Sequence, residues 1–185
     1  MIKRGGNDMK SYHVNGLTYT VRQATVQDAS EMSSLRLQID GETENLDREP
    51  GEAFIDANGF KQLISKDAES PVNLFLVAEA GGQIAGFSRC EGSTLKRFSH
   101  KAEFGVGILK EYWGHGIGRN LLSESIAWAE AAGLKKMTLN VLETNQKAIE
   151  LYQKQGFKIE GTLECDKILS DGQCYRTIVM GRLCE

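Results

Sequence analysis

Residues 111–122 read EYWGHGIGRNLL, in which three alternating glycines, Gly114, Gly116 and Gly118, lead into an apolar run with helical spacing. Glycine is the least favourable helix residue after proline, so three of them before a helix need a physical reason. Free N–H groups at a helix N-terminus bind anions, and a residue without Cβ lets a phosphate approach closely. The stretch predicts a phosphate cradle; a simple glycine-rich turn is the alternative.

Two known phosphate-binding patterns do not fit this stretch. The dinucleotide pattern G-x-G-x-x-G, started at Gly114 or Gly116, needs a third glycine where Arg119 or Leu121 stands. The P-loop pattern needs Gly-Lys where Arg119-Asn120 stands. What remains is G-x-G-x-G without a lysine, which disfavours a nucleotide-binding protein of Rossmann type.

The composition is that of a soluble globular protein. The 185 residues are 41% hydrophobic and 25% charged, with a net charge of −3, which suits one domain. Lys and Arg are spread along the chain, so neither nucleic acid nor a membrane is expected as a partner. Residues 1–12 are polar and carry no apolar signal-peptide region, so we expect a disordered segment there, one domain over 13–185, and a cytoplasmic location.

The sequence contains four cysteines, Cys90, Cys165, Cys174 and Cys184. None forms a C-x-x-C pair or lies at zinc-ligand spacing from a histidine, so no metal site is expected. A hairpin turning at an Asp-Gly pair would place Cys174 opposite Leu169 and Cys165 opposite Ile178, several residues out of register. All four cysteines are therefore predicted to be free thiols in a reducing compartment.

Hydrophobic periodicity and turn signals predict a mixed α+β chain. Strands are expected at 17–25, 72–80, 83–91, 97–109, 136–143, 157–169 and 173–183, and helices at 26–40, 52–68, 117–132 and 145–155. The order is β-α-α-β-β-β-α-β-α-β-β, with antiparallel hairpins and one βαβ unit. This order predicts a mostly antiparallel sheet of six to seven strands flanked by about four helices.

The stretch YWGHGIGRNLL resembles the acyl-CoA pyrophosphate loop of GNAT-type N-acetyltransferases, usually written Gln/Arg-x-x-Gly-x-Gly/Ala. Gly116 and Gly118 match its glycines, and Trp113 stands where Gln or Arg is usual. A second stretch, NQKAIELYQKQGF, resembles another signature of that family. Its matching residues are Asn145, Ala148, Leu151, Tyr152, Gly156 and Phe157. Together with the element order, the resemblance covers nearly the whole chain after the first dozen residues.

The resemblance implies a GNAT-like fold and acetyl-CoA as co-substrate, without a metal. Main-chain amides of the loop would hold the pyrophosphate, and a strand bulge near Ile108 and Leu109 would free amides for the acetyl group and pantetheine. Asn145 would contact the pantetheine arm, although a helix cap explains it equally well. The side chain of His115 is expected to point to water. The loop residues expected at the cofactor are Trp113, Gly114, His115, Gly116, Ile117, Gly118 and Arg119.

Tyr152 is the candidate general acid. In the family resembled, a tyrosine at this position protonates the sulfur of CoA, and an ordinary phenol, with a pKa of about 10, can serve a thiolate leaving group. The alternative is a core aromatic, because Ala148, Ile149 and Tyr152 share one helix face.

Glu103 is the candidate general base for the acceptor amine. On the strand HKAEFGVGI it shares a face with Gly105 and Gly107, whose missing side chains leave room for a substrate. A solvated carboxylate, Glu143 as a rival base, and a chain of waters are the alternatives.

These observations predict transfer of an acetyl group to a primary amine of a small molecule or a protein N-terminus, by direct attack in a ternary complex. The alternative is a non-catalytic acyl-CoA-binding or regulatory module; Trp113 favours it and Tyr152 counts against it. Residues 26–68 would wall the acceptor site, and their carboxylates suggest either a basic acceptor such as a polyamine or a solvated face. Those residues are Asp40, Glu42, Glu44, Asp47, Glu49 and Glu52. A homodimer is left open.

Overall fold

The structure, a computed structural model, describes residues 9–184. Its strands are β1 (Lys10–Val14), β2 (Leu17–Gln23), β3 (Leu74–Ala80), β4 (Gln83–Gly92), β5 (Lys101–Ile108), β6 (Lys136–Leu142), β7 (Lys158–Ile168) and β8 (Cys174–Leu183). Its helices are α1 (Ala29–Glu42), α2 (Ala57–Glu69), α3 (Ile117–Ala131) and α4 (Gln146–Lys154). None of the helices in the described range is both long and apolar enough to cross a membrane.

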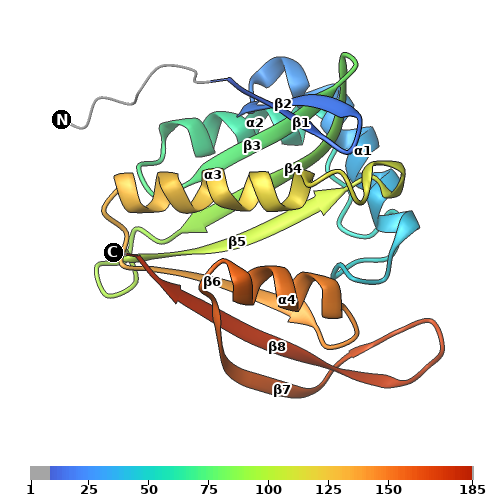
Figure 1. Cartoon of the computed structure of the whole chain (residues 1–185), viewed down its shortest axis with the longest axis vertical. Helices are drawn as coiled ribbons and strands as arrows, with labels where there is room; N and C mark the ends of the chain where they lie inside the picture. Colours follow the sequence, from blue (N-terminus) through green and yellow to red (C-terminus); the bar gives the residue numbers. More distant parts are fainter. Residues whose placement is uncertain (1–8, 185) are drawn as a thin grey trace.

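The strands form one sheet in the order β1-β2-β3-β4-β5-β6-β8-β7 (Figure 1). Neighbouring strands are antiparallel except β5 and β6, which are parallel because α3 carries the chain back across the sheet. The predicted α+β class, with four helices and a mostly antiparallel sheet, is confirmed. Eight strands are present in residues 9–184 instead of the predicted six to seven, and β1 is the strand that the sequence analysis lacks.

The unpredicted strand β1 forms a hairpin with β2 through the turn Asn15-Gly16. Both turn residues have positive φ, 49° and 79°, and Asn-Gly is the preferred pair for such a two-residue turn. Residues 10–12, expected to be disordered, therefore lie in a strand. Residues 1–8 of that expected segment lie outside the described residues.

Helices cover both faces of the sheet (Figure 1). Leu121 of α3 and Tyr152 of α4 join a core with Phe104 of β5, while α1 and α2 pack on apolar residues of β3 and β4. Full burial of such side chains contributes about 1.5–3 kcal/mol each. Because side chains alternate along a strand, Glu103 faces away from the α3–α4 layer that Phe104 joins.

The pairing of β5 with β6 stops part-way along both strands. Three parallel pairs are formed, Lys101↔Lys136, Ala102↔Met137 and Glu103↔Thr138. Beyond them β5 runs on to Ile108 and β6 to Leu142 without pairing to each other. The sheet is therefore split at its middle, where β5 and β6 separate.

The prediction of four free thiols is wrong for two of the cysteines. Cys165 and Cys174 are joined by a disulfide, with their Cα atoms 4.7 Å apart. The β7–β8 register is irregular between Leu163 and Lys167, so that the uninterrupted hairpin assumed from the sequence does not form. This irregularity brings Cys165 back beside Cys174. The other two cysteines are free.

Candidate active site

Within the part of the chain that the structure describes, the backbone amides of residues 114–119 donate to no protein acceptor. On either side of them, the N–H of Trp113 donates to Lys110 O at 3.1 Å and that of Asn120 to Gly116 O at 3.0 Å. Within the described range, no acceptor is recorded for the six N–H groups in between. They lie at the positive end of α3, so the loop meets the physical requirements of an anion site.

The glycines of this loop serve the fold as well as the anion site. Gly116, with φ of 73°, is the left-handed N-cap of α3. A Cβ added to Gly118 would lie 3.1 Å from Ile108 Cδ1, so this glycine lets α3 pack closely on β5. A Cβ at Gly114, where φ is 85°, would meet no atom within 4 Å. The tight turn is therefore present, and its geometry is compatible with the cradle that the sequence poses as the alternative.

Three side chains of the loop take different directions. The indole N–H of Trp113 donates to Ile108 O at 2.9 Å and so fastens the loop to the end of β5. His115 Nδ1 lies 3.4 Å from Val14 O, so this side chain turns to the β1–β2 hairpin and not to water as predicted. Arg119 is exposed beside the loop, and its Nη2 lies 3.6 Å from the Cβ position of Gly116. Arg119 thus supplies a cation where Trp113 supplies none.

The predicted bulge near Ile108 and Leu109 is absent from the β4–β5 register, which is regular from Gly86↔Ile108 to Gly92↔Ala102. The Leu109 N–H donates to Ala85 O at 3.0 Å and is not free. Because amides alternate in direction along an antiparallel strand, the N–H of Ile108 points the other way, toward the separating β6. The amide of Val106 shares that direction and also lies beyond the last β5–β6 pair. The gap between β5 and β6 is therefore lined by free backbone groups of β5.

Tyr152 lies on the α3–α4 side of this gap, with only 8% of its surface exposed. Its ring contacts Phe104 edge-on, with centroids 6.5 Å apart, and Phe157, with centroids 6.0 Å apart. Among residues 9–184, its hydroxyl has no hydrogen-bond partner. In the described residues, Thr177 Oγ1 is the one fully buried side-chain N or O atom without a hydrogen bond, so the Tyr152 hydroxyl keeps access to solvent. Burial raises the pKa of Tyr152 to about 12.

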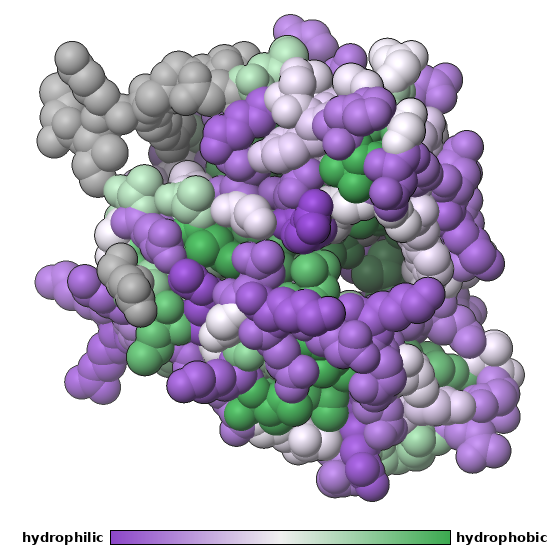
Figure 2. All heavy atoms as spheres, viewed as in Figure 1, coloured by the Kyte–Doolittle hydropathy of each residue, from purple (hydrophilic) through white to green (hydrophobic). Residues whose placement is uncertain are grey.

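Glu103 lies on the other side of the gap, exposed to solvent. Asn140 Nδ2 of β6 donates to its Oε1 at a long 3.5 Å. A Cβ at neighbouring Gly105 would meet nothing within 4 Å, so space beside the carboxylate is open. The rival Glu143 is already used, since its Oε1 accepts the Arg176 N–H at 2.8 Å. Figure 2 shows the surface hollowed between the end of β5 and α4.

Asn145 caps α4, as predicted, because its side-chain oxygen accepts the Ala148 N–H at 3.4 Å. The cap fixes the start of the helix that carries Tyr152. Asn145 is half-buried, so that a further contact with a ligand is sterically open.

A cavity of about 870 Å³ lies between the α1–α2 connection and the tip of the β7–β8 hairpin. Its ionic lining comprises Asp40, Glu42, Glu44, Asp47, Glu49, Glu52 and Asp166, with Arg48 and Lys167 as the cations. Lys167 pairs with Asp47, and the Ser170 N–H donates to Glu44 at 2.8 Å, so the hairpin tip is tethered to the connection. All six carboxylates singled out in the sequence thus line one cavity, a clustering that the sequence could not show.

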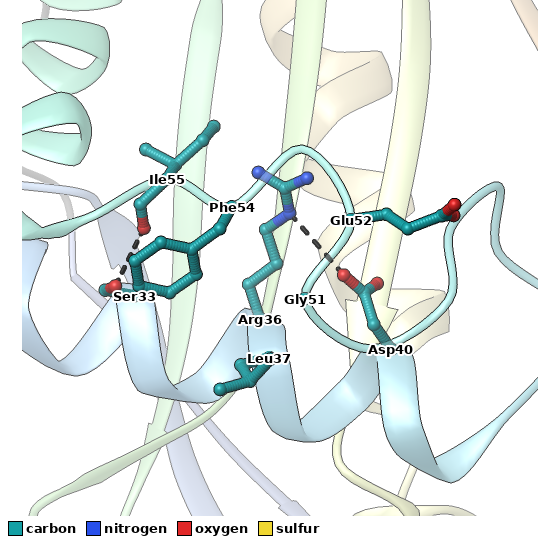
Figure 3. A pocket seen from close by; sticks show the side chains of 8 residues that line it. All are labelled: Ser33, Arg36, Leu37, Asp40, Gly51, Glu52, Phe54 and Ile55. Atoms are coloured by element: carbon teal, nitrogen blue, oxygen red, sulfur yellow. Dashed lines mark hydrogen bonds and ion pairs between the residues drawn. The ribbon is translucent and has the colours of Figure 1, made fainter.

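Beside this cavity, the connection folds back over α1 (Figure 3). Ser33 Oγ donates to Ile55 O at 2.7 Å, and Arg36 Nε lies 3.7 Å from Asp40. Asp40 also pairs with Arg48 at 3.3 Å. The pocket that remains beneath the connection, about 10 Å³, has room for about one water molecule. These contacts hold the wall of the larger cavity in place.

Residues 35–157 match the model of the Acetyltransferase (GNAT) family. The chain belongs to this family. The resemblance inferred from the two sequence motifs is thereby confirmed, and the protein is an acyltransferase. Spermidine N(1)-acetyltransferase of Escherichia coli (strain K12) is 31% identical over 137 residues, which are 74% of this chain and 69% of that protein. L-amino acid N-acetyltransferase AaaT of the same organism is 31% identical over 96 residues, 51% of this chain and 59% of that protein.

Solved GNAT structures share the fold. An acetyltransferase of the GNAT family from Streptococcus pneumoniae superposes with a TM-score of 0.87 at 30% identity, covering 90% of this chain and 99% of that one. A Salmonella typhimurium structure described as an acetyltransferase with its cofactor acetyl-CoA has a TM-score of 0.80 at 19% identity, covering 90% and 94%. In residues 9–184 of this GNAT chain, no group of three or more His, Cys, Asp or Glu side chains is arranged to hold a metal ion.

The raised pKa of Tyr152 predicts how kcat depends on pH in the alkaline range. A general acid must be protonated, so its contribution is lost as pH rises through its pKa. With a pKa of about 12 instead of about 10, Tyr152 should remain protonated, and kcat should show no loss from this group between pH 8 and about pH 11. Steady-state kcat over that range, with activity rechecked after return to pH 8, is the measurement. An alkaline limb near pH 10 that vanishes in Tyr152→Phe would keep Tyr152 as the acid but contradict its raised pKa.

Proposed function

We propose that this protein transfers the acetyl group of acetyl-CoA to a primary amine, and that the six free amides of residues 114–119 hold the pyrophosphate. These amides carry the proposal, because an anion that satisfies them is the simplest reason for leaving them unpaired. Arg119 adds charge beside them. The free edge of β5, at Val106 and Ile108, can pair with the amide groups of the pantetheine arm.

Acetyl-CoA, when bound, supplies the thioester whose carbonyl carbon is open to attack by an amine. Glu103 takes the proton that the amine nitrogen loses, from the open space beside Gly105. Tyr152 donates its phenolic hydrogen on the opposite side of the gap, where the sulfur leaves. The two groups therefore lie on opposite sides of the gap, where one can take the proton of the amine after it adds to the carbonyl carbon and the other can supply hydrogen to the sulfur as the tetrahedral intermediate collapses.

The acceptor that the structure favours is a small cationic amine. The cavity beside the α1–α2 connection carries seven carboxylates against two cations. Most of these carboxylates have protein partners, but none is recorded in the described residues for the side chains of Glu49 and Asp166. The excess of negative charge attracts amines in their protonated form. The name of the spermidine acetyltransferase relative points to the same class of acceptor.

Acetyl-CoA should stabilise the protein, whereas NAD should not. A ligand at one hundred times its Kd adds about 2.7 kcal/mol to the free energy of unfolding, which gives a clear shift in Tm. Thermal melts with millimolar acetyl-CoA, CoA or NAD measure this. An unchanged Tm with both CoA compounds would remove the basis of the proposal. Binding without release of CoA over an amine panel would favour the non-catalytic alternative.

Tyr152→Phe should lower kcat by about 10²–10⁴-fold, the usual worth of a general acid. The substitution removes one hydroxyl and keeps the ring contacts with Phe104 and Phe157, so Tm and the Kd for acetyl-CoA should barely change. Tyr12→Phe, on the distant strand β1, is the matched control and should retain kcat. A Tyr152→Phe kcat within about threefold of wild type, with chemistry shown to be rate-limiting, would assign the proton transfer to another group.

A panel of acceptors tests the charge of the cavity. We expect kcat/KM to be higher for spermidine and related diamines than for neutral amino acids, and to fall as salt is raised. Glu49→Gln combined with Asp166→Asn should lower kcat/KM for spermidine by about two- to fivefold, the range for exposed ion pairs. Glu69→Gln at the end of α2 is the control. A preference for amino acids that is indifferent to salt would place the acceptor elsewhere.

A further inference from the structure

The β1–β2 hairpin braces the loop that the proposed function assigns to the pyrophosphate. Asn15 Nδ2 donates to Gly114 O at 2.7 Å, across 99 positions of sequence. His115 Nδ1 lies 3.4 Å from Val14 O. A Cβ at Gly116 would lie 3.3 Å from Val14 Cγ1, so the hairpin and the loop are in direct contact. The conformation of residues 114–119, called the anion loop below, therefore depends on contacts with the hairpin as well as on its own glycines.

The turn itself does not need the amide of Asn15. Its φ of 49° requires a residue that tolerates the left-handed region, which glycine satisfies at least as well as asparagine. Within residues 9–184, the one recorded hydrogen bond of the Asn15 side chain is the bond to Gly114 O. The side chain thus makes its contact to the loop and not to its own hairpin.

Fixing the Gly114 carbonyl also fixes the next amide. The peptide between Gly114 and His115 is trans, as no cis peptide occurs in the described residues. In a trans peptide the C=O and the N–H point in opposite directions in one plane. Because Asn15 holds the carbonyl on the hairpin side, the His115 N–H is turned away from the hairpin. Glycine at 114 would otherwise let this peptide rotate at little cost.

We propose that Asn15 is a positioning residue for acyl-CoA binding, which orients the Gly114–His115 peptide so that the His115 N–H stays in the anion site. This inference rests on the proposed function of the loop. Without the bond, acetyl-CoA must order the peptide as it binds, and affinity falls because preorganisation is lost. The chemical step, which takes place at the gap between β5 and β6, does not depend on Asn15.

Two substitutions distinguish the contribution of the Asn15 side chain from that of the turn conformation. Asn15→Gly keeps the left-handed backbone and removes the donor. Asn15→Asp keeps the shape of the side chain and replaces the donor with a carboxylate that faces the Gly114 carbonyl. We expect both to raise the Kd and the KM for acetyl-CoA about threefold to tenfold, the range for one net hydrogen bond. We expect kcat at saturating acetyl-CoA, and the KM for spermidine, to stay at the wild-type values.

Thr18→Ala is the matched control, because it removes the 2.8 Å bond between Thr18 and His13 in the same hairpin without touching the loop. It should leave the Kd for acetyl-CoA unchanged, as measured by calorimetry with the full chain. Wild-type affinity in both Asn15 variants, or a lowered Tm with unchanged affinity, would overturn the inference and leave Asn15 a residue of the turn alone. A wild-type protein that does not bind acetyl-CoA would instead overturn the proposed function on which the inference rests.

Discussion

Strands β5 and β6 pair for three residues and then diverge, and the proposed function depends on this separation. Inside a sheet, the backbone N–H and C=O groups of each strand are normally hydrogen-bonded to the neighbouring strands. A buried N–H or C=O without such a bond lowers the stability of the fold by about 1–3 kcal/mol. Here the last pair between β5 and β6 is Glu103↔Thr138, so the rest of β5 has no neighbouring strand on that side. Such an edge can accept a ligand that brings hydrogen-bonding groups of its own. Because the split runs through the sheet, it also connects the two faces, each of which has a separate helical layer.

The alternation of side chains along β5 then assigns the two candidate catalytic groups to opposite sides. Phe104 packs with Tyr152, and its neighbour Glu103 emerges on the other face. A thioester held along the free edge would have the phenol on one side and the carboxylate on the other. The anion loop follows β5 directly, and Trp113 ties it to the last residue of the strand, Ile108. Under the proposed function, one strand would therefore position the pyrophosphate site and both sides of the reacting carbon.

Much of this could be read from the sequence, because the decisive signals are local. The glycine pattern, the cap at Asn145 and the helical spacing around Tyr152 are each contained within a few residues. The β1–β2 hairpin also carries a local signal, Asn15-Gly16, but it lies within a polar N-terminal stretch in which the apolar alternation of a strand is weak. The disulfide between Cys165 and Cys174 depends on a strand irregularity that no composition rule predicts. The clustering of carboxylates around one cavity depends on contacts between distant segments, so no local signal in the sequence could show it.

The environment of Tyr152 limits how it can act. Burial holds its pKa at about 12, whereas an ordinary thiol has a pKa of about 8.5. Full proton transfer from the phenol to a thiolate is then uphill, and more so than for an ordinary phenol. The hydroxyl is therefore better suited to stabilise the developing charge on sulfur with a strong hydrogen bond than to surrender its proton early. That role needs a phenol that is neutral, fixed in direction and without a competing protein partner. The raised pKa, the ring contacts with Phe104 and Phe157, and the lack of a hydrogen bond to the hydroxyl within residues 9–184 meet those three requirements in turn.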